Sequence, residues 1–221
     1  MNIILFGCPG SGKGTQAEFI INKYKIPHIS TGNILRHEIK KKSYIGKKVF
    51  NIIKKGKLVD DKIIIKLIKN RINKKDCKLG YLLDGFPRTI KQANLIKKKN
   101  ITIDIVFEIF TPEKIIIERL SGRRIHTKSG RIYHIKYNPP KNHMIDDITG
   151  DLLDIRLDDN KKIIKKRLIN FYKKTYPLIN FFYKESLNNN IKFFKINNFN
   201  NIQKTSIKIF KIIDKYFPKK Y

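Results

Sequence analysis

Residues 3–13 read IILFGCPGSGK, a short apolar run followed at once by a glycine-rich loop and a lysine. The apolar part, Ile3 to Phe6, has the length of a buried strand, and after Lys13 apolar side chains recur at the spacing of one helix face. A strand, a loop of the form GxxxxGK and a helix in this order predict a phosphate-binding loop. Its glycines let backbone N–H groups converge on phosphate oxygens, while Lys13 reaches the outer phosphates. The alternative, a glycine-rich turn without function, explains only part of this pattern.

The rest of the chain alternates apolar runs with helical periods, which indicates an α/β fold with a parallel sheet flanked by helices. Besides the first strand, we expect strands at residues 81–84, 101–109 and 192–196. Helices are expected from a cap at Ser30 or Thr31 toward Lys41, over 45–54, from Asp60 or Asp61 through Ile72, around Gln92, and over 161–176 and 202–216. Residues 122–159 break this rhythm with closely spaced turn signals and predict a small β insertion.

The 221-residue chain carries 49 Lys and Arg against 18 Asp and Glu, a net charge of +31 that would suit a nucleic-acid or membrane-surface partner. The lysines are scattered among abundant Ile and Asn, whose codons are all AT-rich, so genome composition explains the charge more simply. We therefore expect no specific nucleic-acid partner and no membrane partner, with non-specific RNA binding left open. Two cysteines, Cys8 and Cys77, cannot form a disulfide framework, and no apolar stretch approaches the ~18 residues of a membrane span. The sequence thus predicts a soluble, cytoplasmic protein.

Metal and phosphate binding can be predicted from a few further residues. Gly14 stands where most such loops place Ser or Thr to hold magnesium, so we expect Asp84, at the end of its strand, to face a hydrated Mg²⁺. An aspartate that only caps local backbone is the alternative. The guanidinium group of arginine can donate two parallel hydrogen bonds to one phosphate. In this lysine-rich chain each arginine is a candidate for that role or for a surface ion pair. The arginines are Arg36, Arg71, Arg88, Arg119, Arg123, Arg124, Arg131, Arg156 and Arg167.

Several motifs together resemble those of adenylate kinase. They are GCPGSGKGTQ at residues 7–16, STGNILR at 30–36, LDGFPRTIKQA at 83–93 and GRR at 122–124, while residues 133–159 are similar to the extended lid of the long bacterial-type enzymes. The resemblance covers nearly the whole chain, and DGFPR is far more specific than the phosphate loop alone. It implies a P-loop NTPase-like, parallel five-stranded sheet flanked by helices. The implied units are a core (1–29, 60–121 and 160–221), a helical AMP-binding unit (30–59) and a small β lid (122–159).

The resemblance also implies roles for individual residues. The expected ATP-binding residues are Gly10, Ser11, Gly12, Lys13, Gly14, Thr15, Arg119, Arg123, Ile132, Tyr133 and Asn200. The expected AMP-binding residues are Thr31, Arg36, Lys57, Leu58, Val59, Gly85, Phe86, Pro87, Arg88, Gln92, Arg156 and Arg167. Gln92 would read the adenine edge through its two-sided amide. Lys13, Arg88, Arg123, Arg156 and Arg167 are expected to be catalytic, with Asp84 holding Mg²⁺ through water and Asp158 and Asp159 orienting the lid arginines.

The sequence departs from the family's pattern in three places. Asn33 replaces an aspartate that helps to hold hydrated magnesium, so Asp84 would carry more of the metal's electrostatics. Asn197 and Asn198 replace an acidic and glycine turn near the ATP base. Some members bind zinc in the lid through four cysteines, but this lid has none, so no structural zinc is expected. Instead we expect a hydrogen-bonded polar cluster or, as the alternative, ordinary solvated residues, at His126, Ser129, Asp146 and Thr149.

The sequence therefore predicts a nucleoside monophosphate kinase that converts MgATP and AMP reversibly into two ADP and serves adenine nucleotide homeostasis. Its expected partners are the small molecules ATP, AMP and ADP, and we expect a monomer. Two alternatives compete with this prediction. A kinase of another nucleoside monophosphate would share the loop and the arginines, although Thr31 and Gln92 favour adenine. A basic, nucleic-acid-binding ATPase would need ATP turnover stimulated by RNA and a contiguous basic face. The sequence offers no helicase-type acidic motif after the loop.

Overall fold

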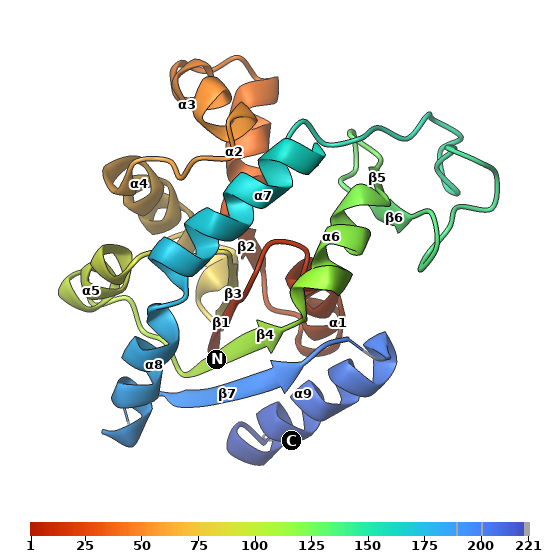
Figure 1. Ribbon diagram of the computed structural model, residues 1–221. Helices are drawn as coiled ribbons and strands as arrows, with labels where there is room; N and C mark the ends of the chain where they lie inside the picture. Colours follow the sequence, from red (N-terminus) through yellow and green to blue (C-terminus); the bar gives the residue numbers. More distant parts are fainter. Residues whose placement is uncertain (189, 200, 219–221) are drawn as a thin grey trace.

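The apolar run Ile3–Phe6 lies in strand β1 (Asn2–Phe6), the middle strand of a parallel sheet with the order β2-β3-β1-β4-β7. The computed structural model describes residues 1–188, 190–199 and 201–218 (Figure 1). The other strands of this sheet are β2 (His28–Ser30), β3 (Tyr81–Asp84), β4 (Ile105–Phe110) and β7 (Lys192–Asn197). The prediction of a five-stranded parallel sheet flanked by helices is therefore confirmed.

Helices cover both faces of the sheet because its central strands are apolar on both sides. Ile3 and Leu5 pack toward α1 (Lys13–Tyr24) and α9 (Ile202–Tyr216), whereas Ile4 and Phe6 pack toward the opposite layer. That layer contains α4 (Asp61–Ile72), α5 (Ile90–Lys98) and α8 (Leu178–Leu187). A third apolar cluster joins α6 (Glu113–Ser121) to α7 (Lys161–Asn170). No helix in the described part of the chain is both long and apolar enough to span a membrane.

The predicted helix starts are confirmed where a side chain caps the backbone. Ser30 Oγ accepts a hydrogen bond from the N–H of Asn33 at the start of α2 (Thr31–Lys40), and Asp60 Oδ1 accepts one from Lys62 at the start of α4. Helix α3 (Tyr44–Lys54) follows α2 closely and packs against it. A short 3₁₀ turn (Lys75–Cys77) then leads into β3.

Two predicted elements differ in the structure. The strand expected at 101–109 begins only at Ile105, because its partner β1 begins at Asn2 and the pairing register starts with Ile3 opposite Ile105. The helix expected over 161–176 ends at Asn170 and continues as a π-turn (Phe171–Thr175) before Pro177 and α8. Because proline lacks an N–H, it suits a helix start better than an interior. Strand β2, which the pattern analysis did not find, is only three residues long.

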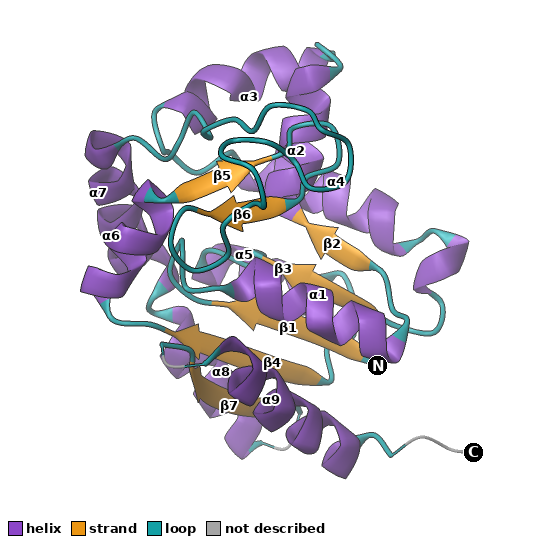
Figure 2. Cartoon of the chain, turned by 90° about the vertical axis from the view of Figure 1, so that its right-hand side faces the viewer, coloured by secondary structure: helices purple, strands orange, loops and turns teal. Residues whose placement is uncertain are grey.

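The residues predicted to form the site lie where the parallel strands end. Both the loop after β1 and Asp84 at the end of β3 are at the carboxyl edge of the sheet. Figure 1 shows α2 and α3 on one side of this edge, and the lid with its antiparallel pair β5 (Arg123–Ile125) and β6 (Ile132–His134) on another. The β5–β6 pair forms a sheet of its own, and Figure 2 shows the loops that surround it.

Candidate active site

Lys13 is held inside the loop that precedes α1. Its Nζ donates hydrogen bonds to the carbonyl oxygens of Gly7 at 2.9 Å and Cys8 at 2.7 Å, and lies 3.4 Å from Ser11 Oγ. Burial lowers the pKa of Lys13 to about 8, although the charge of Asp84 opposes this shift. A bound phosphate would favour the charged form, so the buried ammonium group is suited to bind an anion.

Asn198 closes the glycine-rich loop against the end of β7. Gly12 has a φ of +91°, and a Cβ at this position would collide with the side-chain amide of Asn198. Asn198 donates from Nδ2 to the carbonyl oxygen of Ser11 at 2.6 Å, and Thr111 Oγ1 donates to the same oxygen at 3.2 Å. Arg119 Nη1 in turn donates to the carbonyl oxygen of Asn198 at 2.9 Å. Asn198, at which the chain departs from the family pattern, and Thr111 thus support the loop, a role that the sequence alone did not predict for either residue.

Asp84 is a largely but not fully buried carboxylate near Lys13 and His28. His28 Nε2 lies 3.4 Å from Asp84 Oδ2. Burial alone would raise the pKa of Asp84, but the hydrogen bond from His28 and the charges of Lys13 and Arg88 outweigh it and lower the pKa below its usual value. Asp84 therefore keeps its negative charge at neutral pH, as a ligand of hydrated Mg²⁺ must.

In the described residues, no group of three or more His, Cys, Asp or Glu side chains is placed to hold a metal ion. One carboxylate still fits magnesium, which commonly binds through one or two carboxylates together with water and substrate phosphates. Asp84 lines the same cavity as the phosphate loop, so its donor set suits a metal that arrives with a nucleotide.

Thr31 and Arg88 converge on the carbonyl oxygen of Gly85 from two elements. Thr31 Oγ1 donates to it at 3.1 Å and Arg88 Nε at 2.7 Å. Arg36, one turn into α2, donates from Nη2 to Asn33 Oδ1 at 2.6 Å, and burial lowers the pKa of Arg36 to about 10. These contacts hold two guanidinium groups beside one cavity, in a position to grip a phosphate.

Gln92 lies at the wall of this cavity with its amide bonded on both sides. Its Nε2 donates to Asp61 Oδ1 at 2.6 Å, and its Oε1 accepts from the backbone N–H of Arg88 at 2.7 Å. Thr89 Oγ1 caps the start of α5 by accepting from the N–H of Gln92 at 3.1 Å. An amide has four hydrogen-bonding positions, so one N–H and one lone pair of Gln92 stay free for a ligand.

Three arginines from the lid and α7 meet around two carboxylates. Arg123 binds Asp159 through two parallel bonds, from Nε at 2.7 Å and Nη2 at 2.6 Å. Arg167 Nη1 lies 3.0 Å from carboxylate oxygens of both Asp158 and Asp159. Arg156 differs, because its buried Nε has no hydrogen-bond partner among the described residues, and burial lowers its pKa to about 9. An unpaired buried donor of this kind is costly unless a ligand completes it.

These groups face one cavity of about 890 Å³, large enough for two nucleotides side by side. Most of the predicted site residues line it: Gly10, Gly12, Lys13, Gly14, Thr15, Thr31, Arg36, Lys57, Leu58, Val59, Asp84, Gly85, Pro87, Arg88, Gln92, Arg119, Arg123, Ser129, Ile132, Tyr133, Arg156 and Arg167. Ser11 and Phe86 differ, because their side chains are fully buried in the protein. They contribute to the site through backbone and packing. Asn200 lies outside the described residues.

The sequence pattern of the adenylate kinase family matches residues 5–187 of this chain. The chain belongs to the adenylate kinase family. Adenylate kinases from three strains of Buchnera aphidicola subsp. Acyrthosiphon pisum (Tuc7, 5A and APS) are each 56% identical to it over 196 residues, which cover 89% of this chain and 91% of theirs. Membership confirms the predicted class of enzyme, a phosphotransferase of the nucleoside monophosphate kinase type that acts on adenine nucleotides.

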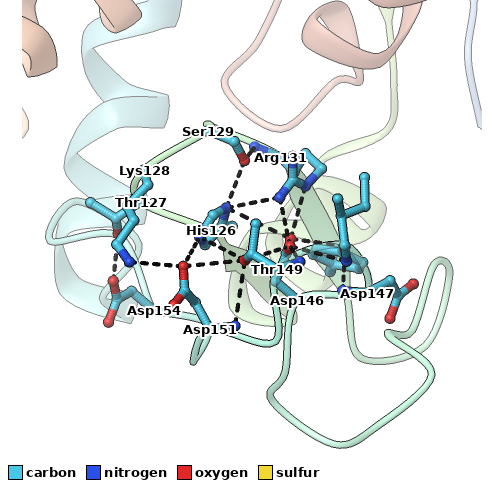
Figure 3. A network of polar contacts seen from close by, with 12 residues as sticks. His126, Thr127, Lys128, Ser129, Arg131, Asp146, Asp147, Thr149, Asp151 and Asp154 are labelled. Carbon is cyan, nitrogen blue, oxygen red and sulfur yellow. Dashed lines mark hydrogen bonds and ion pairs between the residues drawn. The ribbon is translucent and has the colours of Figure 1, made fainter.

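The polar cluster predicted within residues 122–159 lies around Asp146, whose side chain is buried (Figure 3). Thr149 Oγ1 donates to Asp146 Oδ2 at 3.0 Å, and His126 Nδ1 lies 3.7 Å from Oδ1 and 2.7 Å from Ser129 Oγ. The structure therefore brings His126, Ser129, Asp146 and Thr149 together. Arg131, absent from the predicted set, makes the shortest contacts with Asp146, from Nε at 2.9 Å and Nη2 at 2.5 Å.

Further residues complete this lid cluster. Tyr133 donates its hydroxyl to Asp146 Oδ1 at 3.0 Å, and Asp151 Oδ2 lies 2.9 Å from His126 Nε2 and 3.0 Å from Lys128 Nζ. The carboxylate of Asp151 can only accept here, so His126 Nε2 carries the donated proton. The hydrogen bond from Arg131 is the largest influence that lowers the pKa of Asp146, followed by those from Thr149 and Tyr133. Hydrogen bonds from Lys128 and His126 lower the pKa of Asp151 to about 2.

Proposed function

We propose that this chain transfers the γ-phosphoryl group of MgATP reversibly to AMP, giving two ADP. The observation that carries the proposal is the cavity itself, because the phosphate loop with Lys13 and a second group of arginines both line it. Two phosphate-binding groups facing each other suit direct transfer between two nucleotides, in which positioning and charge stabilisation supply most of the catalysis.

On the ATP side, the backbone of residues 10–15 and Lys13 would hold the phosphates. Arg119, tied to the carbonyl oxygen of Asn198, would stack on the base, and Ile132 and Tyr133 from the lid would cover it. Asp84 would bind Mg²⁺ through water, and the ion would neutralise charge on the phosphates. Asn33, already bonded to Arg36, would make only a small contribution to the metal site.

On the AMP side, Arg36 and Arg88 would clamp the phosphate, with Arg88 fixed by the carbonyl oxygen of Gly85. Thr31, residues 57–59 and Gln92 would hold the nucleoside. The free N–H and lone pair of Gln92 match the N1 acceptor and the 6-amino donor of adenine. The phosphate loop, the Arg36–Arg88 clamp and the arginines from the lid and α7 line the same cavity. The AMP phosphate would therefore face the γ-phosphate of ATP.

In the proposed reaction an oxygen of the AMP phosphate attacks the γ-phosphorus of ATP. The bond from that phosphorus to the β,γ-bridging oxygen breaks, and ADP leaves from the loop. Arg123, Arg156 and Arg167 would balance the charge on the equatorial oxygens. Lys13 would stay in contact with the β- and γ-phosphates during the transfer. The chain's own side chains thus bind and orient, and no covalent enzyme intermediate is needed.

Closure would exclude water from this site. The helical unit at residues 30–59 and the lid at 122–159 would move over the core, because an open site would pass the phosphoryl group to water. Arg123 and Arg156 lie in the lid, so closure would also bring them to the reacting phosphate. We further propose that the protein acts in the cytoplasm as a monomer, without a specific nucleic-acid or membrane partner and without structural zinc.

A coupled assay of ADP formation tests this function. ATP and Mg²⁺ are supplied with AMP, CMP, UMP or GMP in turn, and a parallel series replaces the monophosphate with single-stranded RNA. Of the four monophosphates, we expect only AMP to give fast turnover. Preference for another monophosphate would replace AMP as the substrate, and ATP hydrolysis stimulated by RNA without phosphoryl transfer would contradict the proposal.

A further inference from the structure

Asp61 stands behind Gln92 and outside the cavity. Among the described residues, Gln92 lines the cavity and is only 2% exposed, whereas Asp61 does not line it. The two side chains are joined by the 2.6 Å hydrogen bond from Gln92 Nε2 to Asp61 Oδ1, between the first turn of α4 and the first turn of α5. Asp61 is therefore connected to the cavity through its hydrogen bond with Gln92.

The two partners of Gln92 fix which way its amide points. The backbone N–H of Arg88 can only donate, so it must face Oε1, and the carboxylate of Asp61 can only accept, so it must face Nε2. A flipped amide would set donor against donor at Arg88 and acceptor against acceptor at Asp61. Leaving buried polar groups unmatched in this way is costly. The free N–H and the free lone pair of Gln92 thus keep fixed positions at the cavity wall.

We propose that Asp61 is a positioning residue that determines the specificity of the monophosphate site for a 6-aminopurine, an inference that rests on the proposed AMP site. Adenine offers a 6-amino donor beside the N1 acceptor. Hypoxanthine and guanine offer a 6-oxo acceptor beside an N1–H donor. A glutamine amide held in one orientation matches the first pattern and opposes the second, whereas an amide free to turn can satisfy either one.

Asp61 has a competing structural role, because an acidic side chain in the first turn stabilises a helix through its dipole. The two roles respond differently to substitution. Asp61→Asn and Asp61→Ala remove the charge equally, but only Asn keeps an acceptor oxygen for Gln92. The preceding residue offers a control, since Asp60 caps the same helix by accepting from Lys62 N–H at 2.8 Å and is not bonded to Gln92.

The test compares AMP with inosine monophosphate as acceptors for the wild type, Asp61→Ala, Asp61→Asn and Asp60→Ala, with thermal melting of each protein. For Asp61→Ala we expect the ratio of kcat/KM for AMP to that for inosine monophosphate to fall about tenfold or more. The loss should appear mainly in KM for the acceptor, with KM for ATP changing less than about twofold. For Asp61→Asn we expect the same ratio to fall by about a third as much, on a logarithmic scale, as for Asp61→Ala. Asp60→Ala should melt at a lower temperature with an unchanged ratio.

An unchanged acceptor ratio in folded Asp61→Ala would overturn the inference. So would equal effects of Asp61→Asn and Asp61→Ala, because equal effects would assign the role to the helix charge. Failure of the proposed function is a separate result: the wild type would then transfer no phosphoryl group to AMP. If Asp61→Ala does not fold, Asp61→Asn still decides the matter, since it should keep the fold and lower the ratio.

Discussion

The cavity of the candidate active site, called the cleft below, and the lid both contain arginines and carboxylates. They differ in how completely the positive groups are paired with negative ones. In the lid, buried Asp146 faces Arg131, Tyr133 and Thr149, and its pKa is lowered chiefly by the Arg131 hydrogen bond. In the cleft, positive groups crowd one another. Burial lowers the pKa of Arg156 to about 9, and no described residue bonds its Nε.

This difference separates structure from binding. A polar cluster whose members satisfy one another stabilises a fold too small to bury a core, as the lid does without cysteines. A cluster left short of negative charge instead gains most when an anion enters. We therefore expect the same residue types to stabilise the fold in the lid and to bind phosphate in the cleft.

The largest expected effect comes from removing a receptor arginine. Arg123→Ala should lower kcat about a thousandfold, because it removes charge that balances the transferred group. Lysine at this position should restore only part of the rate, since it lacks the two-point geometry of Arg123 on Asp159. Steady-state assays of ADP formation measure both.

The neighbouring arginine is the matched control. Arg124 donates to the carbonyl oxygens of Ser121 and Arg123 and does not line the cavity among the described residues, so Arg124→Ala should keep kcat within about threefold. Equal losses at the two positions would show that general lid disruption, not charge at the phosphate, explains the result.

A smaller effect concerns the protonation of Lys13. Its pKa of about 8 in the free protein should rise when phosphates bind, so ATP binding should take up a proton between pH 8 and the higher bound value. Affinity should then fall by up to about tenfold per pH unit above pH 8, with little dependence on this group near pH 7. Calorimetry at pH 8.5 in two buffers of different ionisation enthalpy measures the uptake.

Lys13→Arg is the control for this titration, because a guanidinium group stays charged throughout the range. Its ATP binding, even if weaker, should show less proton uptake at pH 8.5. Binding to the wild type without proton uptake would contradict the lowered pKa of Lys13.

Local patterns were enough to predict much of the fold. The apolar run at residues 3–6, the capping aspartate at position 60 and the amphipathic stretch from Ile202 each predicted an element that the structure contains. What they could not predict depends on partners: β4 starts where β1 begins to pair, and β2 is a three-residue edge strand defined by pairing with β3. The π-turn before Pro177 likewise places Thr175 where its hydroxyl bonds the carbonyl oxygen of Arg88 at 2.8 Å.

The same distinction between local patterns and distant partners applies to the candidate site. Lys13 and the arginines came from motifs, because their spacing along the chain carries the chemistry. Their supports did not: Asn198 bonds Ser11, Asp61 bonds Gln92 and His28 bonds Asp84 across long separations in sequence. No periodicity relates such pairs, so only the folded chain reveals them.

The lid offers a test of the structural half of the comparison. Asp146→Ala should leave Arg131, Tyr133 and Thr149 without their common acceptor, so amide exchange in the lid should speed up about tenfold or more. Asp147→Ala is the control, because the Asp147 side chain accepts only an exposed backbone N–H, that of Lys141, in the part of the chain that the structure describes. Activity should fall more than AMP affinity, since the lid would cover ATP in the proposed complex.

Acid should act on the lid in the same direction. The lowered pKa values of Asp146 and Asp151 mean that their contribution is fully present above about pH 4 and is lost as pH falls toward the folded values, about 2 for Asp151. Unchanged lid protection in Asp146→Ala, or stoichiometric zinc in the purified protein, would contradict the account of the lid as a metal-free polar staple.

The smallest expected effect is on stability, and it tests the receptor half of the comparison. Arg156 is charged at neutral pH in a cleft that lowers its pKa to about 9, so the folded state carries a cost that is fully present below pH 9 and relieved only above it. Arg156→Met keeps the length of the side chain's apolar stem and removes the charge. We expect this variant to be more stable than the wild type by about 1 kcal/mol, a rise in Tm of about 2–4 °C. Its phosphoryl transfer should nevertheless be severely impaired. Saturating ATP and a non-reacting AMP analogue should shrink or reverse the difference, because bound phosphates would pair with Arg156 only in the wild type. Calorimetric melting of both proteins, with and without nucleotide, makes the measurement. A lower Tm for Arg156→Met in the absence of nucleotide would show that the arginine stabilises the empty cleft, and the contrast with the lid would fail.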